Sequence, residues 1–191
     1  MISRVDHVSI AVKEYDRAYR FFTEILGAIP GATGEDPHMR YRWQILSLGD
    51  LSRVEILNPL GQGSFLDGFL KNKDGGVHHI TLQTPDISAA RKILDARGIK
   101  WFGYHEYPGG VWKELFIHPK DAFGVLIQIA EFRASDWISP AVKMPEGIKF
   151  TVKKKNDGCE ISFGHEGGGV ANISLNRKEM KELAEKIQKI T

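Results

Sequence analysis

The sequence predicts an α+β fold in which two βαβββ modules pair into a curled sheet around a cleft, followed by a small β-meander and helix. Three observations predict this class. The chain repeats itself at a spacing of 72 residues, as from His7 to His79. Its apolar residues alternate with polar ones in short runs, the pattern of half-buried strands. Glycine makes up 20 of the 191 residues, above the usual share of about 7%, which favours a fold rich in turns.

The first module is expected over residues 1–58. It opens with the alternating run 6–12 and continues with a helical pattern that ends at Gly27, a residue suited to a helix C-cap. Two further strand-like runs, 42–48 and 53–57, complete the module.

The second module is expected over residues 77–131 and has the same order. A strand at 78–84 leads into a helix that Asp86 begins. Strand-like runs at 114–117 and 125–129 follow. The two modules together make a two-module domain of residues 1–131.

The repeat ends there, and residues 132–191 form a C-terminal extension of different character. Three strand-like runs come first, at 147–154, 159–163 and 168–174. Asn176 then begins a helix, with Glu179 three residues later as its capping-box partner. We expect this extension to pack on the two-module domain as an accessory unit.

Composition excludes several classes of protein. The 26 basic residues against 24 acidic ones give a net charge of +2, so no nucleic-acid partner is expected. No apolar run approaches the roughly 18 residues of a membrane helix, so no membrane partner is expected either. Cys159 is the single cysteine and cannot form an internal disulfide, which favours a reducing, cytoplasmic setting.

The repeat also duplicates a pair of polar side chains. His7 and Glu55 are 48 residues apart, and His79 and Gln128 are 49 apart. Alternation places each of the four on the polar face of its strand. If the modules pair about a pseudo-twofold axis, the four groups converge. Two imidazoles, a carboxylate and an amide oxygen suit one divalent metal ion: Zn, Ni, Co, Mn or Fe.

A single histidine on a strand is more often structural than metal-binding, and the repetition is what favours a metal site here. His78 is expected on the apolar side of its strand, with Ile80. The remaining histidines lie in expected loops and turns and are expected to be solvated: His38, His105, His118 and His165.

Three segments resemble the vicinal oxygen chelate superfamily, which includes glyoxalase I, methylmalonyl-CoA epimerase, extradiol dioxygenases and bleomycin-resistance proteins. They are Asp-His-Val-Ser-Ile-Ala-Val at 6–12, Gly-Val-His-His-Ile-Thr-Leu at 76–82, and His-Pro-Lys-Asp-Ala-Phe-Gly-Val-Leu-Ile-Gln at 118–128. They look most like the epimerase branch, and the resemblance covers residues 1 to about 131. It implies that the curled sheet surrounds a metal cleft. It also implies that the four ligand positions are His7, Glu55, His79 and Gln128.

One position departs from that pattern. The epimerases and glyoxalases have a proton-transferring Glu where this chain has Gln128. An amide can ligate a metal but cannot act as a base at neutral pH. The same position supplies a carboxylate to the iron site of extradiol dioxygenases, so Gln128 also counts against a dioxygenase. We therefore take Gln128 as a ligating or positioning group, and Glu35 or His38 in the loop 34–38 as the candidate base.

The leading functional hypothesis is a metal-dependent lyase or isomerase that acts on a carbon acid next to a carbonyl through a metal-stabilised enolate. We expect a small-molecule substrate, with an acyl-CoA as one candidate, and a homodimer as one candidate assembly. Five aromatic residues are candidates for the cavity wall: Trp101, Phe102, Tyr104, Tyr107 and Trp112. The alternative is a small-molecule binding protein without catalysis, of the resistance type; an assembly factor is a third option.

Overall fold

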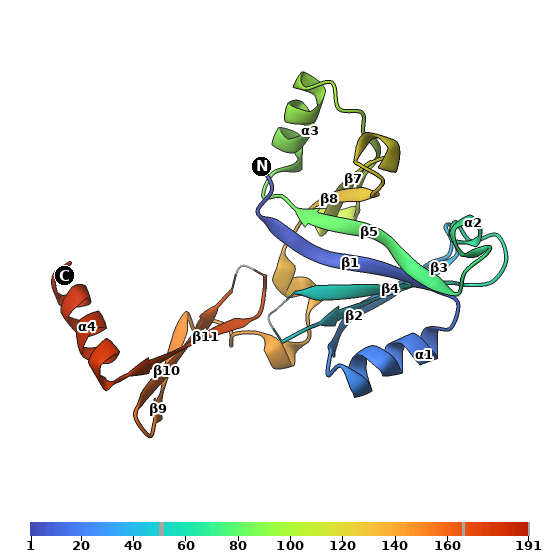
Figure 1. The fold of residues 1–191 in the computed structure, drawn as a ribbon. Helices are drawn as coiled ribbons and strands as arrows, with labels where there is room; N and C mark the ends of the chain where they lie inside the picture. Colours follow the sequence, from blue (N-terminus) through green and yellow to red (C-terminus); the bar gives the residue numbers. More distant parts are fainter. Residues whose placement is uncertain (50–51, 166, 191) are drawn as a thin grey trace.

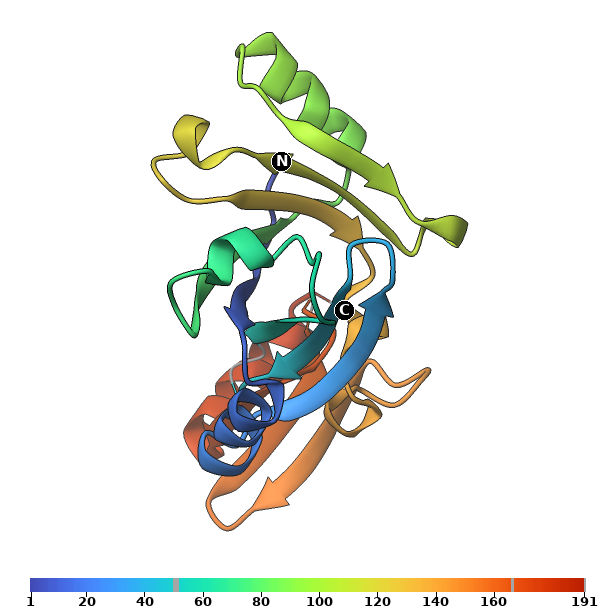
Figure 2. The same cartoon turned by 90° about the vertical axis from the view of Figure 1, so that its right-hand side faces the viewer.

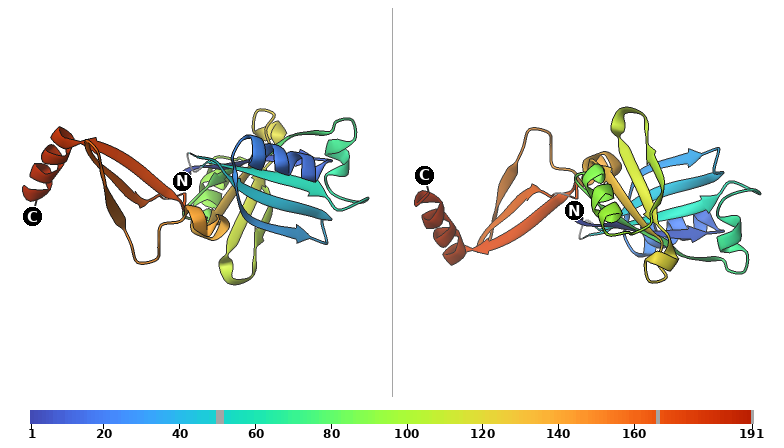
Figure 3. Two further views of the ribbon diagram at one scale, coloured as in Figure 1. Left: turned by 90° about the horizontal axis from the view of Figure 1, so that it is seen from below. Right: turned by 90° about the horizontal axis from the view of Figure 1, so that it is seen from above.

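The computed structural model describes residues 1–49, 52–165 and 167–190 (Figure 1). A curled eight-stranded sheet forms the body, and a three-stranded sheet with one helix projects away from it (Figure 3). The predicted α+β class, with two βαβββ modules and a C-terminal meander and helix, is confirmed.

The first module contains one helical segment and four strands. They are β1 (Arg4–Val12), α1 (Tyr15–Arg20), β2 (Ile29–Asp36), β3 (Tyr41–Ser47) and β4 (Arg53–Pro59). A π-helical turn, Phe21–Ile25, continues α1. The linker to the second module carries the short helix α2 (Asp67–Leu70).

The second module repeats that order. It contains β5 (Gly75–Gln83), α3 (Ile87–Ala96), β6 (Phe102–Glu106), β7 (Trp112–Ile117) and β8 (Ile127–Phe132). The side chain of Asp86 accepts a hydrogen bond from the backbone N–H of Ala89 at 2.9 Å, so Asp86 is the N-cap of α3, as predicted. Short 3-10 turns at Pro108–Gly110 and Pro119–Asp121 connect the strands.

The two modules join edge to edge through β1 and β5. The strand order is β2-β3-β4-β1-β5-β8-β7-β6, so β2 and β6 form the two edges of the curled sheet, with the yellow-green β6 near the top of the view in Figure 2. β1 is parallel to β4 and antiparallel to β5, while β5 is parallel to β8. The central four strands are therefore related by a pseudo-twofold axis between β1 and β5.

Each module packs its helix against one face of its strands. Ile56 of β4 packs with Leu46 and side chains of α1, and Ile129 of β8 packs with Leu94 of α3. Successive side chains of a strand point to opposite faces. Glu55 and Gln128, the neighbours of Ile56 and Ile129, therefore face away from the helices.

The extension consists of β9 (Phe150–Lys155), β10 (Gly158–Gly164), β11 (Val170–Asn176) and α4 (Arg177–Gln188). The predicted capping box of Asn176 and Glu179 is present. Large apolar side chains on β9, β10 and β11 are exposed: Phe150, Val152, Phe163 and Ile173. Two 3-10 turns, Ala134–Trp137 and Pro140–Val142, connect this unit to the body. None of the helices in the described ranges is both long and apolar enough to cross a membrane.

A candidate metal centre in an aromatic cleft

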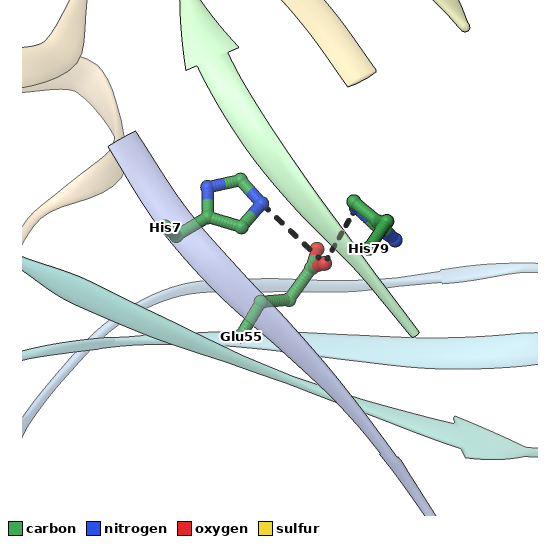
Figure 4. A group of neighbouring side chains, drawn as sticks. All are labelled: His7, Glu55 and His79. Atoms are coloured by element: carbon green, nitrogen blue, oxygen red, sulfur yellow. Dashed lines mark ion pairs between the residues drawn. The ribbon is translucent and has the colours of Figure 1, made fainter. Parts of the chain in front are cut away.

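Three of the four predicted ligands form a compact cluster. His7 on β1, Glu55 on β4 and His79 on β5 place one ligand atom each within 4.8 Å of one another (Figure 4). The carboxylate lies between the imidazoles, with Glu55 Oε2 at 3.5 Å from His7 Nε2 and 3.7 Å from His79 Nε2. Two ligand atoms that each lie about 2.0–2.2 Å from a tetrahedral ion are separated by nearly the same distances as these atom pairs. The three residues could therefore hold a metal ion.

Gln128, the fourth predicted ligand, is buried and lines the same cavity as the three clustered residues. Its Oε1 accepts a hydrogen bond of 2.5 Å from the hydroxyl of Thr81. The same hydroxyl oxygen is 2.8 Å from Nε2 of His7. Thr81 thus links the last strand of the second module to the histidine of the first.

Ser9 makes the equivalent link between the last strand of the first module and the ligand histidine of the second. Its hydroxyl donates to Glu55 Oε2 at 2.5 Å and lies 2.8 Å from His79 Nε2. Ser9 and Thr81 each follow a ligand histidine by two residues and are fully buried. The pseudo-twofold axis thus relates the hydroxyls as well as the ligands.

A β-bulge precedes the ligand histidine in each module. The register of β1 and β5 shifts at Asp6 and at His78, which have no pairing partner. A bulged residue can present its side chain on the same face as its neighbour. His78 accordingly lines the cleft with His79. Its expected position on the apolar side of the strand is wrong, because plain alternation does not allow for the bulge.

The bulged residues contact the Nδ1 atom of their neighbouring histidine. Asp6 Oδ2 is 2.7 Å from His7 Nδ1, and Asp6 also forms ion pairs with Arg4 and Arg53. Burial alone would lower the pKa of His7, but hydrogen bonds to Asp6 and Glu55 raise it to about 9. Asp6 therefore directs Nε2 of His7 into the site, the usual task of a carboxylate behind a metal-binding histidine.

In the second module, the bulged residue that contacts Nδ1 of the ligand histidine carries an imidazole instead of a carboxylate. His78 Nδ1 lies 3.0 Å from His79 Nδ1, and its ring packs edge-on against Phe65 and Phe69. Burial lowers the pKa of His79 to about 3, so His79 is neutral at pH 7. A neutral imidazole is the form that binds a metal.

Glu114 on β7 is a further site residue that sequence reasoning missed. Its Oε2 accepts hydrogen bonds from Gln128 Nε2 at 2.6 Å and from the indole N–H of Trp112 at 2.8 Å. Burial raises the pKa of Glu114 above its ordinary value. The amide of Gln128 is thereby oriented, with its nitrogen toward Glu114 and its oxygen toward Thr81. The sequence does hold a signal for Glu114. Alternation along β7 places Glu114 and Phe116 on one face of the strand, and Leu115 and Ile117 on the other.

The cluster lies in a cavity of about 290 Å³ with a largely aromatic wall. Its aromatic lining residues are Tyr41, Trp43, Phe65, Tyr107, Trp112, Phe116 and Trp137. Of the five predicted wall residues, Tyr107 and Trp112 line the cavity. Trp101, Phe102 and Tyr104 do not, and Trp101 instead packs against the core beneath α3. The described lining includes no Lys or Arg, so no side-chain cation of that kind faces the site.

The structure does not bring Glu35 or His38 into this cleft. The Glu35 carboxylate lies 3.3 Å from a guanidinium nitrogen of Arg42, and His38 is exposed in the turn after β2. Asp36 and Met39, their neighbours, line the cavity instead. Successive side chains of β2 point to opposite faces, so Glu35 points away from the cleft because Asp36 points into it. The role of Glu35 or His38 as a base stays a prediction, which this geometry does not favour.

Comparison with known proteins places the chain in a family. Residues 6–116 match the model of the glyoxalase/bleomycin resistance protein/dioxygenase superfamily. The chain belongs to this superfamily. Two similar curated proteins are the ethylmalonyl-CoA/methylmalonyl-CoA epimerase of Cereibacter sphaeroides and the mitochondrial methylmalonyl-CoA epimerase of Homo sapiens. The first is 38% identical over 134 residues, 69% of this chain and 99% of the relative. The second is 36% identical over 132 residues, 68% of this chain and 74% of the relative.

Solved structures show the same fold. Methylmalonyl-CoA epimerase from Mycobacterium tuberculosis superposes with a TM-score of 0.62 at 27% identity, over 69% of this chain and 89% of that one. A Streptomyces coelicolor methylmalonyl-CoA epimerase in complex with 2-nitronate-propionyl-CoA superposes with a TM-score of 0.61 at 26% identity, over 73% of this chain and 100% of that one. The predicted vicinal oxygen chelate fold and the likeness to the epimerase branch are confirmed.

Proposed function

We propose that this member of the superfamily is a metal-dependent isomerase that moves a proton at a carbon acid next to a carbonyl, with an acyl-CoA thioester as substrate. The observation that carries the proposal is the cluster of His7, Glu55 and His79, with Gln128 beside it, inside an aromatic cleft. Relatives named as methylmalonyl-CoA epimerases support the reaction class. A neighbour in complex with an acyl-CoA analogue supports the substrate class.

The donor set fits a borderline divalent ion. His7 and His79 would supply Nε2 atoms, Glu55 a carboxylate oxygen and Gln128 its amide oxygen. When bound, such an ion offers positions for two substrate oxygens and stabilises the negative charge that develops when the neighbouring carbon loses its proton. The described lining holds no Lys or Arg that could take over this task.

Glu114 is the residue that we assign to the proton transfer. It lines the cleft, and its carboxylate contacts the amide of Gln128, which has no basic atom of its own. The raised pKa of Glu114 brings the carboxyl closer to neutral pH, where general acid–base exchange is most efficient. In this assignment Glu114 accepts the α-proton of the substrate at a carboxylate oxygen, which is the half-reaction that deuterium exchange measures; inversion of the α-carbon also needs a proton donor at its opposite face.

Solvent-deuterium incorporation into a panel of thioesters, with metal saturating, tests the proposal. We expect exchange at the acidic carbon of a methylmalonyl-type thioester by the wild-type protein. Glu114→Gln should reduce the exchange rate by about 10²–10⁴-fold, the usual contribution of a general base, while leaving bound metal unchanged. Exchange by Glu114→Gln at the wild-type rate would instead assign the base elsewhere, with Glu35 and His38 the next candidates.

A protein that binds a small molecule without catalysis is the second candidate, and Gln128 favours it. An amide stands where the resemblance implies a proton-transferring carboxylate. Gln128→Glu would restore an anionic ligand and a possible base at that place. Exchange that only Gln128→Glu performs would identify a scaffold that has lost its base. No exchange by wild type or variant, across thioesters and 2-oxo compounds, would favour the binding protein.

A further inference from the structure

Trp137 lines the cleft between walls that come from different modules. Its ring lies 5.6 Å from that of Trp43 on β3 and 5.0 Å from that of Trp112 on β7, measured between centroids. Trp112 in turn lies 6.5 Å from the ring of His7. Three indoles from three parts of the chain therefore form an apolar wall on the His7 side of the site.

Trp137 does not belong to either repeated module. It ends the 3-10 turn Ala134–Trp137, at the start of the C-terminal extension and beyond residues 6–116 that match the superfamily. The extension thus supplies a wall residue to a cavity whose ligands all come from the two modules. The repeat contains no signal for such a contribution.

The turn that carries Trp137 is fixed on three sides. A guanidinium nitrogen of Arg53 donates to the carbonyl of Ala134 at 3.2 Å, and Arg53 is buried. A Cβ on Gly31 of β2 would lie 2.4 Å from the carbonyl oxygen of Trp137. A Cβ on Gly168 would lie 2.5 Å from the backbone nitrogen of Ser135. These close contacts fix the backbone of the turn, and the rings of Trp43 and Trp112 pack against the indole itself.

We infer that Trp137 is a specificity-determining residue that limits the length of the substituent on the α-carbon of the substrate. The inference rests on the proposed function. A flat aromatic wall without a Lys or Arg in the described lining suits an uncharged alkyl group. Within the substrate class of the proposed function, longer substituents at the α-carbon would then collide with the indole.

The test is a series of 2-alkylmalonyl thioesters with methyl, ethyl, propyl and butyl substituents, assayed on the metal-loaded full chain. Exchange rates give kcat/KM, and calorimetry gives Kd for each compound. For Trp137→Ala we expect the longest accepted substituent to increase, with kcat/KM for butyl relative to methyl rising at least tenfold over wild type. One methylene in an apolar pocket changes specificity by about 10–200-fold, so this shift is measurable.

Two further variants make the outcome decisive. Trp101→Ala is the matched control, because Trp101 packs against the core near α3 and does not line the cleft; its substituent profile should equal that of wild type. Trp137→Leu keeps an apolar side chain of smaller volume and replaces Trp137→Ala if the latter fails to fold.

The result that overturns the inference is an equal loss for all four substituents in the Trp137 variants, which would show a structural role only. If wild type exchanges no thioester, the proposed function fails, and the Kd series still tests Trp137. Tighter binding of the longer compounds by Trp137→Ala, relative to the methyl compound, then supports the length limit. An unchanged Kd profile overturns it.

Discussion

The amide of Gln128 can serve as a ligand because its two ends are distinguished by their partners. Its nitrogen donates to Glu114 and its oxygen accepts from Thr81. Without the acceptor at Glu114, the amide could rotate and present its nitrogen, which has no lone pair for a metal. Glu114 is therefore a positioning residue for Gln128 as well as our candidate base.

These two tasks of Glu114 can be separated by substitution. Glu114→Leu removes the acceptor and should weaken metal affinity by about 10–100-fold, as the loss of other outer-shell partners does. Glu114→Gln keeps an acceptor oxygen and should retain the affinity. The measurement is competition with a chelating indicator, and the visible spectrum of the Co(II) form reports on the ligand set. Trp112→Phe, which removes the indole donor to Glu114 and keeps an aromatic ring in the wall, is the control and should bind metal normally. Equal affinities for Glu114→Leu and wild type would contradict this role.

The different partners of His7 and His79 predict how many protons metal binding releases. The pKa of His7 is about 9, so His7 is protonated at pH 7.5, whereas the pKa of His79 is about 3 and that histidine is already neutral. An ion at Nε2 must displace the proton of His7 only. We expect close to one proton released per ion at pH 7.5. Affinity should fall about tenfold per pH unit below 9 and level off above it.

Calorimetry in buffers of different ionisation enthalpy counts these protons. Asp6→Asn removes the anionic partner of His7, lowers the pKa of His7 and should reduce proton release at pH 7.5. His78→Asp places a carboxylate beside His79 and should increase the release. Wild type that releases no proton at pH 7.5 would show that His7 is neutral in the metal-free protein.

At the scale of the elements, the central strands were predictable and the edge strands were not. β1, β4, β5 and β8 bury one apolar face each, so their residues alternate. β2 contains Pro30, Gly31 and Gly34, and every residue of β6 is exposed. Edge strands of this kind carry little periodic signal, and β2 accordingly includes residues 34–36 of the expected loop 34–38.

The residues of the candidate site divide in the same way, into those that the sequence predicts and those that it does not. His7, Glu55, His79 and Gln128 follow from the repeat, because equivalent positions in two modules must meet across the pseudo-twofold axis. The bulges at Asp6 and His78 could not be predicted, since they depend on the pairing of β1 with β5. Trp137 could not be predicted either, because it reaches the cleft through contacts between the modules and a segment outside them.

The two capped helices should respond differently to loss of their caps. α3 buries Ile87, Ala90 and Leu94, whereas α4 buries none of its described residues. Removal of an N-cap side chain costs about 0.5–2 kcal/mol of helix stability. Asp86→Ala should therefore lower the free energy of global unfolding by about 1 kcal/mol. Asn176→Ala should fray α4, which lowers the circular dichroism at 222 nm, and leave the main unfolding midpoint unchanged. A comparable loss of global stability in both variants would show that α4 unfolds together with the body.

For the whole molecule, the end of the two-module domain at residue 131 stays a prediction, and the contacts made just beyond that residue bear on it. The second sheet approaches the body at the turn that contains Gly168, which packs on Ala134 and Ser135. Ala134 and Trp137 themselves contact Arg53, Trp43 and Trp112 of the body. The segment up to Trp137 is thus integrated with the modules, although its sequence lies outside the repeat. Homodimerisation stays a prediction that the structure of one chain does not test.

Two truncations test this boundary by thermal unfolding and metal binding. A chain ending at Val142 keeps the turn that carries Trp137, and we expect it to unfold cooperatively within a few degrees of the full chain and to bind metal equally well. A chain ending at Phe132 loses the hydrogen bond from Arg53 to Ala134 and the indole of Trp137. Because Arg53 also holds Asp6 behind His7, this shorter chain should still fold, with a clearly lower midpoint and weaker metal binding. A chain ending at Val142 that does not fold would show that β9–β11 and α4 belong to the cooperative unit, against the two-part organisation expected from the repeat.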